Sequence, residues 1–423
     1  MIVRQQTTCP GCMETITVRV AVASTDLLRF YAPCPSCSTP IRGSMQGSSL
    51  QDFRLDIESG FRREEGDFPI VSVNPQFPIN RHATGLDSPS GSQNILFNEL
   101  AGGGEKTLRL MAIAREVNEC IEAIPGIRRL LEYYEHENET AFWSFLESQS
   151  SQPKPSEMKP GTIHGVLHHI WMNWTSNFLV GLPDTVAVAE AMGEVADWHR
   201  QSLANAAYCS ALETSVTTGT SQVLTRRIIS ATRSLMSAAP AWSVGYLRNR
   251  VADEARLGPL DLLQDEFDRL RDVYQNVFEA CCSSLWLIVL MRNTVENGSP
   301  DDFTGISYTK PNDPKTYTIN TLSQFNKLAN SFKISIVAGF PKVGASMAYL
   351  NSRTRNAIGH ASAHHDLRTG DIRNDEGDMK PYFDFVGEVF SLFGPLVVAV
   401  QCSRSVAVAG RDDSLPKVVA GAP

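Results

Sequence analysis

Two short pairs of cysteines near the N-terminus constrain the fold of this chain more than any other feature. Cys9-Pro-Gly-Cys12 and Cys34-Pro-Ser-Cys37 each place two thiols on one tight turn. Two such turns can direct four thiolates at a single metal ion, and paired Cys-x-x-Cys motifs are typical of zinc sites. Four sulfur ligands fill the coordination sphere of zinc. The pattern therefore predicts a structural Zn²⁺ held by all four cysteines, with two redox-active dithiols as the alternative.

The segment between the pairs predicts two strands. Ile16, Val18 and Val20 alternate with more polar residues, which is the period of a half-buried strand. A turn at 23–26 follows, and residues 27–31 return toward the second pair. This layout resembles a zinc ribbon, with a β module at residues 1–45. So small a module buries little apolar surface, and structural zinc supplies about 10–16 kcal/mol of apparent binding energy.

The remaining chain predicts a mainly α-helical protein behind that small β zinc ribbon. Residues 46–103 are rich in Ser, Gly, Pro and Asn, which indicates a linker that is partly disordered. Helical periodicity then marks a helical middle region at 104–214 and a helical bundle at 215–405. Residues 406–423 are expected to form a flexible tail.

Composition and charge narrow the classes of function. The net charge is −8 in a chain of 423 residues. That balance argues against non-specific coating of nucleic acid, which needs a broad basic face, but it permits a local basic groove. The start of the chain lacks an apolar signal segment, and the apolar run at 281–291 is too short to span a bilayer. We expect a cytoplasmic protein without a membrane partner.

A helix is predicted after Pro341 because apolar residues recur there at about 100° per residue. Asn356 and His360 lie together on the opposite, polar side with Arg353, and His364 sits at the border of that side. The predicted apolar stripe comprises Val343, Met347, Leu350, Thr354, Ala357, Ile358 and Ala361.

The polar side of this helix carries the residues that predict chemistry. Arg355 falls between the two sides, and its long side chain can bend toward the His360 imidazole. A hydrophilic turn follows at 365–371, with Thr369-Gly370 at its tip. Arg355-Asn356-x-x-x-His360 resembles the motif of the HEPN superfamily of helical ribonucleases and nucleotide-binding proteins. Arg353 fits a longer spacing of the same motif, so the sequence leaves open which arginine acts.

The resemblance implies an up-down HEPN-like bundle and a homodimer whose motif helices face one another. It also implies RNA as the partner, a toxin or anti-phage defence role, and an antitoxin or sensor protein as a possible further partner. A histidine and an arginine can cleave RNA through the ribose 2′-OH, so no catalytic metal is expected. In this interpretation Arg355, Asn356 and His360 are catalytic, and Arg353 and His364 are auxiliary.

Two other interpretations compete with the nuclease. The first is a non-catalytic RNA-binding or protein-interaction adaptor built on a HEPN-like dimer. The second is a zinc enzyme using His164, His168 and His169, although helical histidines without the zincin glutamate are usually structural. Arg226 and Arg227 belong to an arginine-rich stretch at 221–250, which is either a solvated helix face or a strip along an RNA groove.

Overall fold

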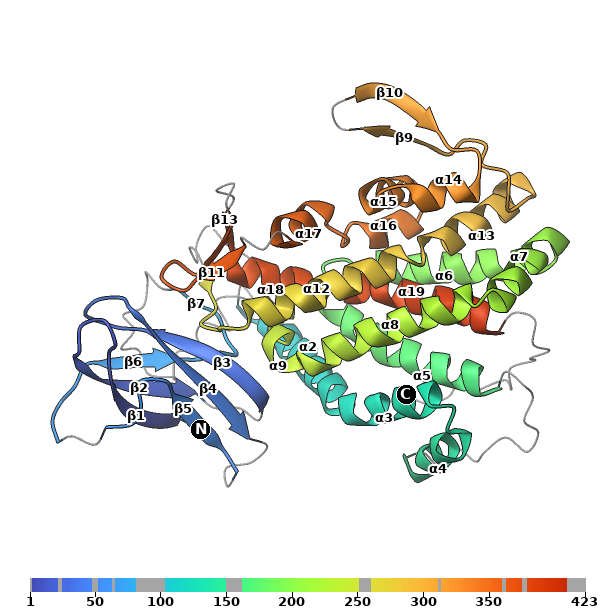
Figure 1. Ribbon diagram of the computed structural model, residues 1–423. Coiled ribbons are helices and arrows are strands. Elements are labelled where there is room, and N and C mark those ends of the chain that lie inside the picture. The colour runs from blue at the N-terminus through green and yellow to red at the C-terminus, as the bar shows by residue number, and fades with distance from the viewer. Residues whose placement is uncertain are drawn as a thin grey trace. The chain divides into compact units, whose positions relative to one another are not determined.

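The computed structural model consists of small N-terminal β-sheets followed by a mostly helical chain, which confirms the predicted fold class (Figure 1). Two compact units are present, and each combines segments that are far apart in the sequence. Unit 1 comprises 1–118, 238–275 and 353–391, and unit 2 comprises 119–237, 276–352 and 392–423. The structure describes residues 2–21, 25–47, 52–62, 65–80, 103–149, 162–250, 260–310, 313–359, 363–374 and 379–408.

Two three-stranded sheets form the N-terminal part of unit 1. Their inward side chains, including Ile16, Val18 and Val20, are fully buried and confirm the period-two prediction. The first sheet has the order β1-β2-β6, in which β2 and β6 are parallel, and the second has the antiparallel order β3-β4-β5. The strands are β1 Ile2–Thr8, β2 Thr15–Ala21, β3 Thr25–Pro33, β4 Pro40–Gly47, β5 Arg54–Ile57 and β6 Ile70–Val73.

Part of the segment predicted to be a linker, 46–103, belongs to these sheets. β5 pairs with β4, and β6 runs parallel to β2 with Val71 and Val73 buried. A four-residue alternation of buried and exposed side chains is a weak signal in a segment rich in Ser, Gly and Pro. The parallel partner of β6 also lies 53 residues earlier in the sequence, with Thr17 opposite Ile70, so the local sequence does not reveal it. The described part of this segment therefore completes the β module.

Later chain segments complete unit 1. β7 pairs with β8, and the short hairpin of β11 and β12 is extended by β13. α10 packs against α18. These elements are β7 Ile79–Asn80, α9 Ala239–Trp242, α10 Gly245–Arg248, β8 Leu260–Asp261, α17 Ser352–Gly359, β11 His364–Asp366, β12 Asp371–Arg373, β13 Met379–Pro381 and α18 Tyr382–Ser391, together with the first parts of α2 Glu105–Glu122 and α12 Phe267–Cys282.

Unit 2 is built around α19, whose residues from Leu396 to Val400 are almost completely buried. α5, α6 and α8 pack against it (Figure 1). The elements of this unit are α3 Ile124–Glu135, α4 Glu139–Gln149, α5 Thr162–Asn177, η1 Phe178–Gly181, α6 Thr185–Ser202, α7 Ala206–Thr217, α8 Thr220–Ser237, α13 Leu285–Asn297, β9 Ser307–Lys310, β10 Asp313–Thr318, α14 Leu322–Lys327, α15 Asn330–Ala338, α16 Val343–Met347 and α19 Phe393–Val408.

The C-terminal boundary differs from the prediction. A flexible tail was expected from residue 406, but α19 continues to Val408, and Val406 is buried. The apolar period of the helix simply extends further than its last strong core residues indicate. Residues 409–423 lie outside the described part of the chain.

The helix predicted from Pro341 through Ala361 is interrupted. α16 ends at Met347 and α17 begins at Ser352. Asn351 and Ser352 are residue types that favour helix starts over helix interiors, since their side chains compete for backbone hydrogen bonds. Five of the seven residues of the predicted apolar stripe are nevertheless buried across the interruption: Val343, Met347, Leu350, Thr354 and Ile358. Ala357 is half-buried, and Ala361 lies outside the described residues.

Two helical stretches within the described residues are apolar enough to span a membrane by composition, Phe267–Asn297 and Tyr382–Ala407. Their most apolar windows are 72% and 89% buried inside the protein. Burial of this extent is what core helices of a soluble protein show.

Candidate functional site

The four cysteines lie on two knuckles with the same backbone geometry. In each knuckle the first cysteine N–H donates to the carbonyl five residues later, Cys9 to Glu14 at 2.9 Å and Cys34 to Thr39 at 3.0 Å. The residue after the second cysteine adopts a left-handed conformation, with φ of 61° at Met13 and 60° at Ser38. One knuckle joins β1 to β2 and the other joins β3 to β4.

The knuckles bring all four sulfurs into one cluster, as the sequence predicts. The ligand atoms lie within 4.8 Å of one another, with Cys9 and Cys37 at 3.5 Å and Cys12 and Cys34 at 3.8 Å between sulfurs. Sulfurs around a tetrahedral zinc with bonds of ~2.3 Å are roughly 3.8 Å apart, so the spacing fits such an ion. Cys9 and Cys34 are buried while Cys12 and Cys37 are exposed, and the four thiols can hold a structural metal.

The surroundings of two of these thiols change their acidity in opposite directions. Burial raises the pKa of Cys34 to about 12. The Thr39 hydroxyl, 3.2 Å from the Cys37 sulfur, lowers the pKa of Cys37 to about 6. The Gly11 N–H also points at the Cys9 sulfur at 3.3 Å. A backbone N–H directed at sulfur in this way stabilises the thiolate form that binds a metal.

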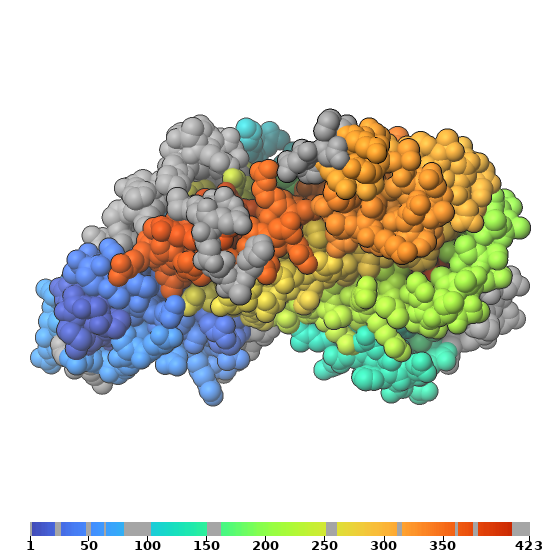
Figure 2. Space-filling model, turned by 45° about the horizontal axis from the view of Figure 1, so that its top comes forward, coloured from blue at the N-terminus to red at the C-terminus, as the bar shows by residue number. Residues whose placement is uncertain are grey.

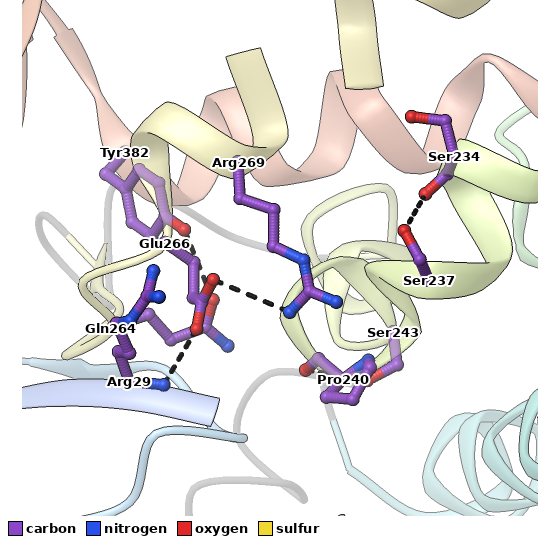
Figure 3. Close-up of polar contacts among 9 residues, drawn as sticks. All are labelled: Arg29, Ser234, Ser237, Pro240, Ser243, Gln264, Glu266, Arg269 and Tyr382. Atoms are coloured by element: carbon purple, nitrogen blue, oxygen red, sulfur yellow. Dashed lines mark hydrogen bonds and ion pairs between the residues drawn. The ribbon is translucent and has the colours of Figure 1, made fainter. Parts of the chain in front are cut away.

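The β module is joined to a segment more than 200 residues later in the chain. Glu266 is 2% exposed, and its carboxylate accepts the Arg29 N–H of β3 at 2.8 Å. Arg269 pairs with the same carboxylate at 3.7 Å (Figure 3). Nearby, the Asp265 N–H donates to the Arg29 carbonyl at 3.1 Å, and Asp265 pairs with Arg42 of β4 at 3.0 Å. Strands that carry the cysteine knuckles are therefore anchored to the chain that leads into α12.

A buried amide extends this junction to α18. Gln264 donates from Nε2 to the Pro75 carbonyl at 2.6 Å. Its side-chain oxygen accepts the Tyr382 hydroxyl at 3.3 Å (Figure 3). His365 of β11 stacks on Tyr382 with ring centroids 4.3 Å apart. His365 also forms a T-shaped contact with Tyr31 of β3, with ring centroids 5.8 Å apart. The ring sequence Tyr31–His365–Tyr382 thus links the β module to the hairpin that follows the motif helix.

α17 presents part of the predicted catalytic set. Thr354 and Ile358 are buried, whereas Asn356 is exposed and Arg355 is half-buried. The buried face is fixed by polar contacts as well: Lys380 Nζ donates to the Thr354 hydroxyl at 3.4 Å. The helix therefore has little freedom to rotate, and it holds Asn356 on its outer side.

The Arg355 guanidinium lies toward the C-terminal end of α17. Its Nη1 is 3.4 Å from the Asn356 side-chain oxygen. A methyl group added at Gly359 would lie 3.9 Å from the same Nη1 and 3.6 Å from Gln275 Nε2. Gln275 in turn donates to the Ile358 carbonyl at 3.5 Å. Arg355, Asn356 and Gln275 thus gather around the last turn of the helix.

The other predicted site residues are placed less closely together. Arg353 is exposed on α17. His364 lies on strand β11, opposite Arg373 of β12, so it does not share the helix face that the periodicity predicted. The helical period of 3.6 residues applies only as far as Gly359, whereas His364 belongs to a strand, in which side chains alternate every two residues. His360 lies outside the described residues.

The turn predicted at 365–371 is present as the β11–β12 hairpin. Gly370 has a φ of +79°, and its carbonyl accepts the Tyr382 N–H at 2.9 Å. A Cβ at this position would overlap the Asp261 carboxylate. The tip of the hairpin therefore requires glycine for two reasons, its left-handed backbone and its close approach to β8.

The helical histidines of α5 have structural roles in unit 2. His168 is fully buried between the His164 carbonyl, 2.7 Å from Nδ1, and the Ser403 hydroxyl, 3.1 Å from Nε2. Since the carbonyl can only accept, Nδ1 carries the proton. Burial lowers the pKa of His168 to about 4. Among the described residues, the only His, Cys, Asp and Glu group able to hold a metal is the four-cysteine cluster.

The sequence analysis did not identify the residues that connect the strands of the cysteine knuckles to the later segments of unit 1. Gln264, Glu266 and Tyr382 have no motif, and their partners lie 118 to 237 residues away in sequence. Glu266 stands among other acidic residues, Asp265 and Asp268, so nothing in the local sequence marks it as buried. Comparisons with protein-family models, curated proteins and solved structures return no match to this chain.

Proposed function

We propose that this protein is a HEPN-type endoribonuclease that cleaves RNA by 2′-OH transesterification without a catalytic metal. The observation that carries the proposal is the placement of Arg355, whose guanidinium lies at the last turn of α17 beside Gly359, the residue before His360. Asn356 is held on the same outer turn. This arrangement favours Arg355 over the exposed Arg353 as the arginine of the motif.

The chemistry follows from these side chains. His360 removes the proton from a ribose 2′-OH, and the oxygen attacks the neighbouring phosphorus. Charge that gathers on the non-bridging phosphoryl oxygens is stabilised by the Arg355 guanidinium, which presents two parallel donors. An imidazolium then protonates the departing 5′-oxygen. The products are a 2′,3′-cyclic phosphate and a free 5′-hydroxyl, and each proton transfer contributes typically ~10²–10⁴-fold.

A homodimer supplies the second imidazole in this scheme. His360 of one copy acts as the base and the same residue of a second copy acts as the acid. The exposed position of Asn356 supports this geometry, since α17 directs its polar turn away from its own buried face. We further propose a cytoplasmic toxin or anti-phage role, with an antitoxin or sensor protein as partner and Zn²⁺ as the structural metal of the cysteine cluster.

The proposal can be tested by incubating zinc-loaded protein briefly with RNA in EDTA, which removes free metal ions. The zinc content is measured again afterwards to verify that the protein has kept its structural metal. We expect cleavage that leaves 2′,3′-cyclic phosphate ends and that fails on the same strand made with 2′-O-methyl ribose. His360→Ala and Arg355→Ala should each lose at least about 100-fold in rate. Arg355→Lys should remain impaired, because a lysine cannot make the bidentate contact.

Arg353→Ala is the matched control, since it removes the same charge from the same helix at an exposed position. It should retain activity within a few-fold. Equal losses in Arg353→Ala and Arg355→Ala would contradict the assignment of the arginine. A folded, zinc-loaded dimer that binds RNA but cleaves none of several RNAs would favour the adaptor instead.

A further inference from the structure

A cavity lies entirely within unit 2, and no residue of α17 lines it. It has a volume of about 440 Å³ and is bounded by α7, α8, α14 and α15 and the beginning of α13. In Figure 2 the orange region that contains α14 and α15 borders the yellow and lime-green regions that contain α13 and α8. Cavities of ~300–1,000 Å³ are the size in which proteins bind small molecules.

The charged side chains of this cavity are both cationic. Arg227 of α8 and Lys333 of α15 line it, and its wall contains no carboxylate. Neither side chain makes a hydrogen bond or an ion pair with another described residue. Desolvation by burial lowers the pKa of Lys333, while Glu279 and Cys282 act against that effect. Glu279 lies outside this cavity and lines a neighbouring one with Arg227. The cavity itself therefore presents two cations and no carboxylate, which favours an anionic ligand.

An aromatic surface stands beside these cations. Trp286 of α13 is half-buried in the cavity wall, whereas the other five tryptophans are buried. Its ring pairs with no described aromatic residue, and its indole N–H donates to none of the described groups. Leu224 and Phe325 add apolar surface, and the amide of Asn326 offers a further donor. An accessible indole face stacks well on a flat ring.

We infer that this cavity binds a small phosphorylated molecule that carries a flat ring, such as a nucleotide. Arg227 and Lys333 contact the phosphate, and Trp286 stacks on the ring. Charge-assisted bonds to phosphate fix one end of the ligand, and stacking selects a ring at the other. The proposed site is separate from the motif residues of α17, so it does not depend on the nuclease activity.

Full-length protein titrated with AMP, ATP, adenosine and inorganic pyrophosphate tests the inference. AMP or ATP should bind saturably, raise the melting temperature and change the tryptophan fluorescence. Adenosine lacks the phosphate and pyrophosphate lacks the ring, so each should bind at least about tenfold more weakly. Trp286→Phe should abolish the fluorescence change while the thermal shift persists.

Arg227→Gln and Lys333→Gln should each weaken AMP or ATP binding by roughly 10–100-fold, the effect of losing a hydrogen bond to a charged group. Arg226→Gln is the matched control, because this neighbouring arginine lines a different cavity. All three variants should melt like the wild type without ligand. The inference is overturned by absence of saturable binding at 1 mM probe, by equal losses in Arg226→Gln and Arg227→Gln, or by pyrophosphate binding as tightly as AMP.

Discussion

Unit 1 and unit 2 are stabilised in different ways. Unit 1 joins its three chain segments through a buried amide at Gln264 and a buried carboxylate at Glu266, and its first segment also carries the four-cysteine cluster. Unit 2 surrounds α19 with apolar helices, and its buried histidine is neutral. A unit that relies on a few polar and metal contacts loses much when one is removed, whereas an apolar core distributes its stability over many side chains.

Removing the metal should have the largest effect and should separate the two units most clearly. With Zn²⁺ bound, the cluster stabilises the β module by an apparent ~10–16 kcal/mol, so chelation or Cys34→Ala should unfold β1–β4. Hydrogen exchange should then increase in those strands and in 260–266, with α19 as the reference. One zinc per chain should be lost in Cys34→Ala and retained in Cys209→Ala. An unchanged metal content in Cys34→Ala would contradict the assignment of this ligand.

Mild acid should destabilise unit 2 through its buried histidine, His168. His168 has a pKa of about 4 in the folded protein against 6.5 when unperturbed. The folded state therefore takes up fewer protons, so this stabilisation is present above pH 6.5 and is lost as the pH falls from 6.5 toward 4. The shift is worth about 3 kcal/mol in full, of which about 2 kcal/mol is lost by pH 5.

Urea unfolding of unit 2 at pH 7.5 and at pH 5 checks this loss. His168→Gln should reduce the difference in unfolding free energy between the two pH values by about 2 kcal/mol. The exposed His136 provides the control, and His136→Gln should leave the difference as it is in the wild type. A wild-type difference that persists in His168→Gln would assign the pH dependence to another group.

Replacing the buried amide Gln264 should lower the free energy of unfolding more than replacing the half-buried amide Gln275. Gln264→Ala leaves the Pro75 carbonyl and the Tyr382 hydroxyl without this partner, at a cost of about 1–3 kcal/mol in unfolding free energy. Gln275→Ala removes one long contact of 3.5 Å to Ile358 and should cost less than about 1 kcal/mol. Denaturant unfolding of both variants compares them, and a larger loss at Gln275 would reverse the expected order.

The smallest expected change in stability comes from two glycines of unit 1, Gly370 in the β11–β12 hairpin and Gly359 at the end of α17. Gly370→Ala should destabilise unit 1 by about 1–2 kcal/mol, because its φ is +79° and a Cβ would overlap Asp261. Gly359→Ala meets only ordinary contacts on a helix and should stabilise by about 0.5–1 kcal/mol. Melting temperatures should therefore move in opposite directions. A destabilised Gly359→Ala would indicate that the end of α17 requires glycine.

The features predicted correctly from the sequence are those with local causes. The Cys-x-x-Cys turns and the alternation at Ile16, Val18 and Val20 specify the knuckles and β2 within a few residues. Gly370 at a hydrophilic tip specifies the hairpin turn. Each of these depends on a dihedral preference or a short period that neighbouring residues express directly.

The features that the sequence did not reveal depend on partners far away in the chain. β6 lies in a Ser- and Pro-rich segment, and it is a strand because it pairs with the distant, parallel β2. The apolar period was right across 343–358, yet it could not show that the backbone leaves the helix before Ser352.

The anchoring of β3 by Glu266 also has a consequence for synthesis of the chain. The two partners are 237 residues apart, so β3 leaves the ribosome roughly 10–50 s before its anchor at ~5–20 residues per second. During that interval the nascent knuckles depend on their own backbone hydrogen bonds and on any metal that the four cysteines bind. Metal supply at the moment of translation should therefore govern the yield of folded protein, and zinc added only after release should rescue less of it.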